Sequence, residues 1–150
     1  MMFLTHLAFG FFAGLCFLPF LNPPNQILFM TFVMIASALP DIDHPDSKFG
    51  KWVKPIGWLF EHRGFFHSVF AVALFSFLAY YFTQQKIVLF AVLIGYVSHI
   101  LIDSINHKGI MPFHPLSRFT LKGFIASGGV LEYILLIVFV ALGFWKLFSL

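Results

Sequence analysis

The stretch IVLFAVLIGYVSHILIDSI, from Ile87 to Ile105, decides the fold class of this chain. It has nearly the length of about 20 residues that a helix needs to cross roughly 30 Å of hydrocarbon. Near its end it carries an imidazole, His99, and a carboxylate, Asp103. Ionisable groups inside a membrane span are costly and usually functional. The stretch therefore predicts a transmembrane helix with a functional site near one end.

The rest of the chain has the same apolar character. Its 150 residues are 60% hydrophobic and 10% charged, and include 23 Phe. The mean hydropathy is +0.93. Because a soluble domain is about one quarter charged, this composition excludes a water-facing globule. The apolar runs predict an all-α polytopic membrane protein, a single integral membrane domain over residues 1–150 with a bundle of about five transmembrane helices, at residues 3–21, 24–40, 64–82, 87–105 and 130–150.

Charge and cysteine content exclude two further classes. The formal net charge is only +3 and the basic residues are scattered, which is not the pattern of a nucleic-acid-binding surface. The one cysteine, Cys16, offers neither a disulfide framework nor a paired-cysteine metal motif. The first apolar stretch has neither a preceding basic region nor a small-residue cleavage site, so we expect it to be retained in the mature protein.

Five alternating spans would make the chain polar on one side of the membrane only. The start of the first, third and fifth spans and the end of the second and fourth would share that side, which receives all 7 histidines and all 6 acidic residues. It also receives the basic residues other than Lys86 and Lys146. The positive-inside rule makes this side cytoplasmic, with the N-terminus and the site inside and the C-terminus outside. We expect a bacterial or archaeal cytoplasmic membrane.

The spacing of His99 and Asp103 places both side chains on one helical face. Residues four apart in a helix are neighbours, so an imidazole and a carboxylate can approach one metal ion. His107 would extend this row if the helix continues to it. The alternative is a His–Asp hydrogen bond that satisfies both groups inside a helix bundle.

A second group of candidate ligands follows Pro40. Asp41, Asp43 and His44 come directly after the second span. Carboxylates in such a turn can bind one or two cations, because hard cations prefer oxygen ligands. The alternative is a turn that ends the helix, in which the Asp side chains cap backbone groups.

A third group stands at the start of the third span, where His62 and Arg63 precede His67. A guanidinium suits a phosphate because it makes two parallel hydrogen bonds, although Arg63 alone also fits a positive-inside anchor. His6, alone in the first span, would fit a core histidine. Together, four separated segments bring His or Asp to one depth on one side and predict a metal site. The candidate ligands are His6, Asp41, Asp43, His44, His62, His67, His99, Asp103 and His107.

These motifs resemble those of the YdjM-type inner-membrane proteins, a family described as membrane-bound metal-dependent hydrolases. The matching pieces cover nearly the whole chain: Thr5-His6 with Gly10, Leu39-Pro-Asp-Ile-Asp-His44, His62-Arg-Gly-x-x-His67-Ser68, His99-Ile-Leu-Ile-Asp103 and Pro112-Phe-His-Pro-Leu-Ser117. The family is in turn similar to zinc-dependent phospholipases C and single-strand nucleases, which cleave phosphoesters with clustered metals.

The resemblance implies which residues hold metal. One ion would be held by an aspartate of the 41/43 pair with His67, His99 and Asp103, and a second by His6 with Asp103 as a bridge. The soluble enzymes also have a His-x-x-x-Glu pair that nothing after His107 reproduces, so we expect one or two divalent ions, zinc with manganese as the alternative. Those enzymes use their N-terminal amine as a ligand, and we expect Met1 to be poorly placed for that role.

The predicted function is that of a metal-dependent hydrolase, phosphoesterase-like or phospholipase-like, acting at the cytoplasmic face. Asp41 or Asp43, whichever does not bind metal, would be the general base, and Arg63 would assist at the phosphoryl oxygens. The expected partners are the lipid bilayer and a phospholipid or lipid-phosphate substrate, with no nucleic acid and no protein partner predicted. The alternatives are a structural or regulatory membrane protein with a structural metal site and a divalent-cation transporter.

Overall fold

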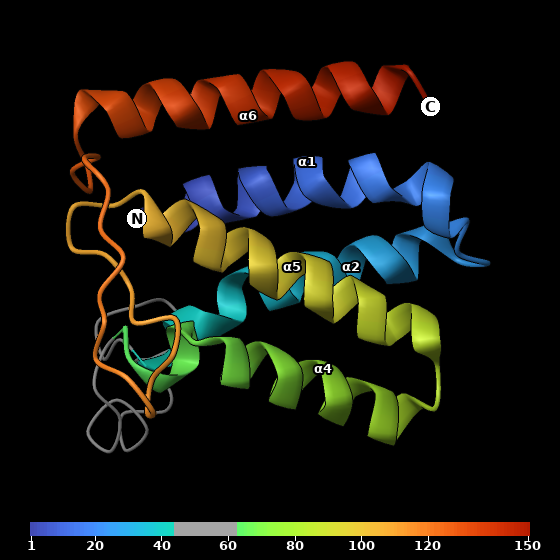
Figure 1. The fold of residues 1–150 in the computed structure, drawn as a ribbon. Coiled ribbons are helices and arrows are strands. Elements are labelled where there is room, and N and C mark those ends of the chain that lie inside the picture. The colour runs from blue at the N-terminus through green and yellow to red at the C-terminus, as the bar shows by residue number, and fades with distance from the viewer. Residues whose placement is uncertain (44–62) are drawn as a thin grey trace.

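The computed structural model describes residues 1–43 and 63–150, without the side chain of Asp43. The described residues form five α-helices, which lie side by side in Figure 1, and two short 3-10 helices. The α-helices are α1 (Phe3–Leu21), α2 (Gln26–Ala38), α4 (Val69–Thr83), α5 (Lys86–Ser104) and α6 (Val130–Phe148), and the 3-10 helices are η1 (Leu39–Asp43) and η3 (Phe65–His67). The prediction of an all-α membrane protein is confirmed.

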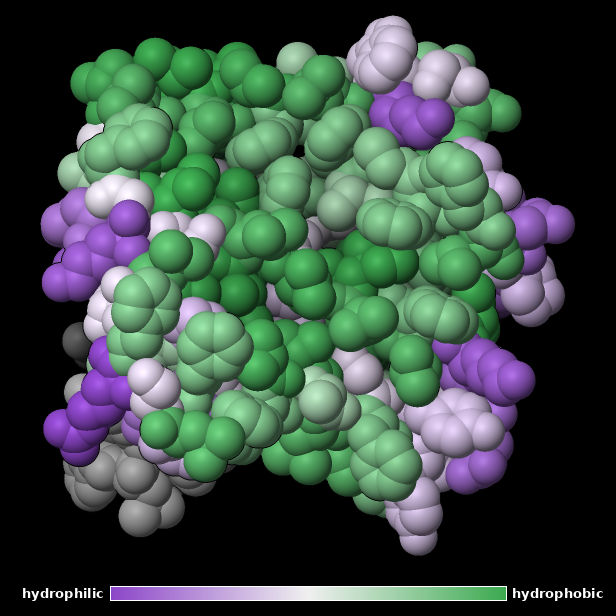
Figure 2. Space-filling view, viewed as in Figure 1, coloured by the Kyte–Doolittle hydropathy of each residue, from purple (hydrophilic) through white to green (hydrophobic). Residues whose placement is uncertain are grey.

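Three of the helices are long and apolar enough to cross a membrane. These are α1, α5 and α6, each with 19 residues. The face in Figure 2 is apolar across its middle, and hydrophilic side chains gather at its two opposite ends. This distribution fits a bundle that is surrounded by lipid along its flanks, because hydrocarbon cannot solvate polar groups.

The helices α2 and α4 are shorter than the predicted spans, with 13 and 15 residues. The α2 helix begins where the side chain of its N-cap Asn25 accepts the backbone N–H of Leu28. It ends before Pro40, which has no backbone N–H to continue the helix, and the chain passes into the 3-10 helix η1. The α4 helix begins only at Val69, because the Ser68 hydroxyl caps it and the preceding residues form η3. Both shortened ends are occupied by 3-10 helices that carry candidate site residues.

Close packing of small residues brings α5 against its neighbours. The α5 helix packs on α1, α2 and α4, whereas α6 packs on α1. At the contact with α2, a Cβ atom added to Gly95 would lie 2.2 Å from the carbonyl oxygen of Val33 and 2.9 Å from the Cβ of Ala36. Small residues at helix interfaces allow the backbones to approach closely in membranes. Gly95 therefore fixes the position of α5 beside α2, one turn before His99.

All predicted polar ends meet at one end of the bundle. The N-terminal ends of α1, α4 and α6 and the C-terminal ends of α2 and α5 lie together at the left of Figure 1. The segment from residue 105 to residue 129, which joins α5 to α6, also lies at this end. The alternation of helix directions that the sequence predicts is thus present in the fold.

Candidate metal centre

Asp103 is the centre of a buried group of polar side chains. Its carboxylate, in the last turn of α5, is only 1% exposed. The Oδ1 atom lies 2.7 Å from the α-amino nitrogen of Met1 and 3.4 Å from Nε2 of His6. The Oδ2 atom lies 3.4 Å from Nε2 of His67 and 3.8 Å from Nε2 of His99. The two carboxylate oxygens thus face two different sets of donors.

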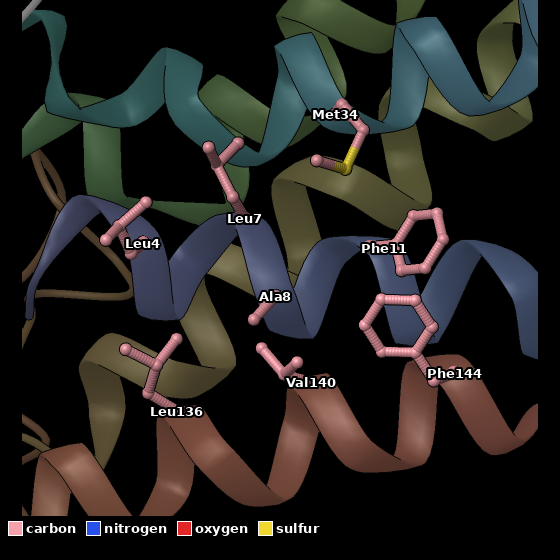
Figure 3. A pocket seen from close by; sticks show the side chains of 8 residues that line it. All are labelled: Leu4, Leu7, Ala8, Phe11, Met34, Leu136, Val140 and Phe144. Carbon is pink, nitrogen blue, oxygen red and sulfur yellow. The ribbon is translucent and has the colours of Figure 1, made fainter.

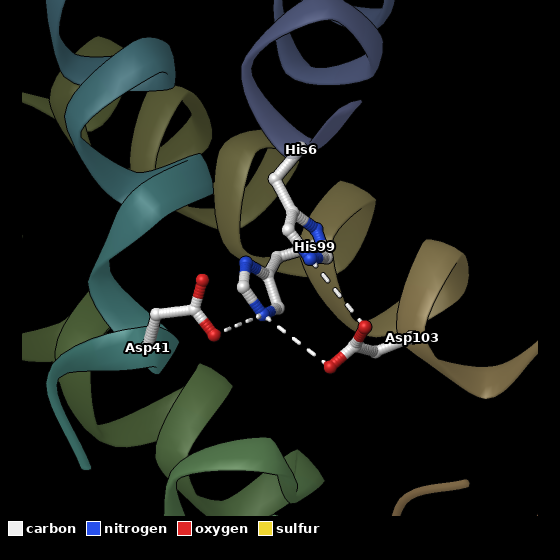
Figure 4. Close-up of side chains that lie close together, drawn as sticks. All are labelled: His6, Asp41, His99 and Asp103. Atoms are coloured by element: carbon white, nitrogen blue, oxygen red, sulfur yellow. Dashed lines mark ion pairs between the residues drawn. The ribbon is translucent and has the colours of Figure 1, made fainter. Parts of the chain in front are cut away.

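A second contact fixes the ring of His99. Its Nδ1 lies 2.8 Å from the backbone carbonyl oxygen of Ser37, and because a carbonyl only accepts, Nδ1 carries the proton. The Nε2 lone pair is then directed toward the group, 3.7 Å from Oδ1 of Asp41 (Figure 4). It also lies 3.3 Å from Nε2 of His67. A backbone carbonyl that orients a histidine in this way is common behind metal-binding imidazoles.

The spacing of the ligand atoms suits a metal ion. One ligand atom from each of His6, Asp41, His99 and Asp103 lies within 4.8 Å of the others, so this group could hold a metal ion. A tetrahedral ion with bonds of 2.0–2.2 Å separates its ligand atoms by about 3.3–3.6 Å. The separations of 3.3, 3.4 and 3.8 Å within the set of His67, His99 and Asp103 are close to that range.

Two buried side chains of this group have polar atoms without a hydrogen bond. Within the part of the chain that the structure describes, neither ring nitrogen of His6 has a hydrogen-bond partner, and its side chain is fully buried. The Oδ2 atom of Asp103 is buried and accepts no hydrogen bond, although Nη2 of Arg63 and Nε2 of His67 each lie 3.4 Å away. Buried polar groups in native proteins are nearly always paired, so the unsatisfied ring nitrogens of His6 beside the Asp103 carboxylate fit a group that binds a cation.

Arg63 closes one side of the group. It has a left-handed backbone conformation, with a φ of 66°, and is buried. Its Nη2 lies 3.4 Å from Oδ2 of Asp103, and its Nη1 donates to the carbonyl oxygen of Gly109 at 2.9 Å and to Oδ1 of Asn106 at 3.4 Å. The guanidinium therefore joins the carboxylate at the centre of the group to the backbone that follows α5.

The structure brings together some of the predicted residues and separates one. His6, Asp41, His67, His99 and Asp103 meet in the group, with Arg63 against it. His107 is exposed and lies outside, with its ring at 3.4 Å from the carbonyl oxygen of Ile125. The extension of the helical row to His107 is wrong because α5 ends at Ser104. The side chain of Asp43 and the residues His44 and His62 lie outside the described residues.

The first two residues make contacts that the sequence did not predict. We expected the N-terminal amine of Met1 to be poorly placed for a role as a metal ligand. That expectation is wrong, because the amine nitrogen contacts Asp103 directly. Glu132 is completely buried and accepts the backbone N–H of Met2 at 2.5 Å and that of Gly128 at 2.6 Å. An isolated acid in the first turn of an apolar helix was the available signal, but the sequence alone did not identify its partners.

The fold and the buried group define a class of protein: a helical membrane protein with a His/Asp group, at one end of its bundle, that could hold a metal ion. The chain belongs to the YdjM inner-membrane protein family, whose model matches residues 1–149.

Individual relatives support this assignment. The chain is 40% identical over 88 residues to the inner membrane protein YdjM of Escherichia coli (strain K12) and equally to that of Shigella flexneri, with 51% of this chain and 44% of each relative covered. It is 27% identical over 107 residues to the uncharacterized protein YvsG of Bacillus subtilis (strain 168), with 68% of this chain and 67% of that protein covered. The chain thus spans less than half the length of the YdjM relatives. No solved structure matches it.

Proposed function

We propose that this protein is a membrane-bound, metal-dependent hydrolase that cleaves a phosphoester whose apolar part lies in the bilayer. The observation that carries the proposal is the meeting of three histidines and two aspartates from four chain segments around one buried point. A mixed imidazole and carboxylate set is the kind that binds zinc in catalytic sites, and manganese also accepts it. The location at one end of an apolar bundle favours a lipid-like substrate, whose phosphate would lie at that depth.

The ligand roles follow from the two faces of the Asp103 carboxylate. We assign one ion to His67, His99 and Oδ2 of Asp103, because these atoms are 3.3–3.8 Å apart. His6 and Oδ1 of Asp103 would hold a second ion. A divalent ion held by these residues would supply Lewis acidity for a phosphoryl oxygen and would lower the pKa of a water molecule.

The remaining polar side chains have separate roles. We assign proton acceptance from the attacking water to Asp41, because its side chain is 16% exposed whereas that of Asp103 is 1% exposed. A proton acceptor must be within reach of water, and Asp103 is not. Arg63 has its guanidinium on Asp103 and on the backbone of Gly109, so we assign it to positioning Asp103.

An apolar groove beside the site supports a substrate with a hydrocarbon part. It has a volume of about 410 Å³ and lies between α1, α2 and α6 (Figure 3). Its lining includes Leu4, Leu7 and Phe11 of α1, and Leu7 directly follows His6. The same turn of α1 therefore presents an imidazole to the site on one face and an apolar wall on an adjacent face.

The test is hydrolysis of phospholipids by purified, metal-loaded protein in mixed micelles, followed by phosphorus NMR. Phosphatidylglycerol, phosphatidylcholine and phosphatidic acid are offered separately, and we expect at least one to release a water-soluble phosphate product. Chelation or the His67→Ala substitution should reduce the rate more than about a hundredfold, because the charge-stabilising site is lost. The matched control is His107→Ala, which removes an exposed imidazole outside the group and should retain the rate.

Two results would contradict the proposal. Metal-loaded protein that releases no phosphate product from any of the three lipids would remove the hydrolase assignment. If chelation then unfolded the protein, the site would be a structural metal site. A rate that persists at full strength after chelation would exclude the metal from the reaction.

A further inference from the structure

The segment between α5 and α6 has a fixed shape. Ile110 and Leu121 exchange two backbone hydrogen bonds, of 3.0 and 2.9 Å, and His107 donates its backbone N–H to Ile125 at 2.9 Å. The segment is also attached to the site, because Met111 donates its backbone N–H to the carbonyl oxygen of Arg63 at 3.2 Å. Its outward side chains therefore form a defined surface, which we call the 107–124 surface.

Large apolar side chains project from this surface. Five of them, within twelve consecutive residues, are 44–81% exposed. They are Phe113, Leu116, Phe119, Leu121 and Phe124. Keeping apolar area in water costs about 25 cal/mol per Å², and contiguous exposed apolar patches mark membrane or protein contacts. Full exposure of this part of the chain to bulk water is therefore energetically unfavourable.

Cations alternate with these apolar side chains. Lys108, Arg118 and Lys122 are exposed on the same surface. The sequence has no Asp or Glu between Asp103 and Glu132, and both of those carboxylates are buried and engaged. The surface therefore carries three positive charges that no acid of its own segment neutralises. Burial of this surface in the hydrocarbon layer is also unfavourable, because a charged side chain there has a high free-energy cost.

The boundary between hydrocarbon and water satisfies both kinds of side chain. The segment lies at the end of the bundle where the helices end (Figure 1), and Figure 2 shows hydrophilic groups bordering the apolar face at this end. At that depth the apolar side chains enter the acyl layer while the Lys and Arg side chains reach the phosphates. An acidic protein partner would match the cations but would leave the five apolar side chains without a surrounding.

We propose that the 107–124 surface is an interfacial binding surface for anionic phospholipids. The three cations contact the headgroup phosphates, and the five apolar side chains anchor the segment among the acyl chains. Each basic residue near an anionic lipid surface adds attraction that salt weakens. This inference is independent of the proposed hydrolase function, because none of the side chains that would contact lipid belongs to the proposed metal site.

The experiment measures which lipids collect beside the surface. A fluorophore is attached to Ser117→Cys in a Cys16→Ala background, and the protein is reconstituted into phosphatidylcholine vesicles. Brominated phosphatidylglycerol or brominated phosphatidylcholine is then added at the same mole fraction. We expect the anionic lipid to quench about threefold more effectively. The preference should disappear in Arg118→Gln/Lys122→Gln and should weaken in about 0.5 M NaCl.

The matched control removes two cations from the other end of the bundle. Lys86→Gln/Lys146→Gln changes the net charge by the same amount and should leave the preference intact, since Lys86 begins α5 and Lys146 lies in the last turn of α6. Equal quenching by the two lipids in the parent protein would overturn the proposal, and would direct attention to an acidic protein partner. Loss of the preference in the control variant would also overturn it, because the effect would then be one of net charge.

Discussion

Replacing Asp103 by Asn is expected to reduce metal affinity by more than about a hundredfold, because the proposed site uses this carboxylate as a ligand and loss of a residue that only orients a ligand already costs about 10- to 100-fold. Asparagine keeps the size of the side chain but removes the negative charge that faces Met1, His6, His67 and Arg63. Because the proposed hydrolysis depends on the metal, we expect the Asp103→Asn protein to lose that activity as well. Affinity for zinc is measured in detergent by competition with a chromogenic chelator.

The Asp103→Asn variant will also be less stable, because Arg63 and the Met1 amine lose a buried counter-charge. Glu132→Gln separates this effect from ligand loss. It alters another fully buried carboxylate, which pairs with backbone N–H groups and lies outside the proposed metal-binding group. This control should unfold more readily and still bind zinc within about threefold of the parent affinity. Equal loss of affinity in both variants would contradict the ligand role of Asp103.

Replacing Gly95 by Ala is expected to destabilise the bundle by about 2 kcal/mol or more, although Ala is the better helix former by about 1 kcal/mol. The added Cβ would lie 2.2 Å from the backbone oxygen of Val33 and 3.0 Å from the backbone nitrogen of Ser37. Backbone atoms cannot move aside as the end of a flexible side chain can. The helices would have to separate, which would also disturb the contact between Ser37 and His99.

The control for Gly95 is Gly143→Ala in α6. There, among the residues that the structure describes, the added Cβ would meet only the ring of Phe11, at 3.1 Å, and that ring can tilt. We expect its stability to stay within about 1 kcal/mol of the parent value. Thermal unfolding in detergent, followed by circular dichroism, compares the two variants. A Gly95→Ala protein as stable as Gly143→Ala would show that close contact between α2 and α5 does not hold the bundle together.

The sequence predicted the helices well where apolarity and helix-ending residues coincide. The first span agrees with α1, and the fourth differs from α5 by a single residue at each end. The third span was placed too early, because apolar residues such as Phe65 and Phe66 suit either kind of helix. The break between η3 and α4 lies at Ser68, whose backbone is extended and whose hydroxyl caps α4. That cap is a local hydrogen bond, which an apolar run does not encode.

The site was predictable to the extent that it depends on helix spacing and direction. His99 and Asp103 are four residues apart, and the alternation of spans places His6, Asp41 and His67 at the same end. The contacts of Arg63 and Glu132 depend on loop backbone, namely on Gly109 and Gly128, whose positions no periodicity gives. The prediction that His107 extends the row of His99 and Asp103 was wrong because α5, which carries that row, ends at Ser104.

The most direct test of the shared metal site is the metal content of protein purified in detergent without chelators. Elemental analysis is done on the parent protein, on His99→Ala and on His107→Ala. We predict at least about one divalent ion per chain in the parent and in His107→Ala, and almost none in folded His99→Ala. A parent protein that remains free of divalent metal after incubation with zinc or manganese, or a His99→Ala variant that retains the parent content, would contradict the account.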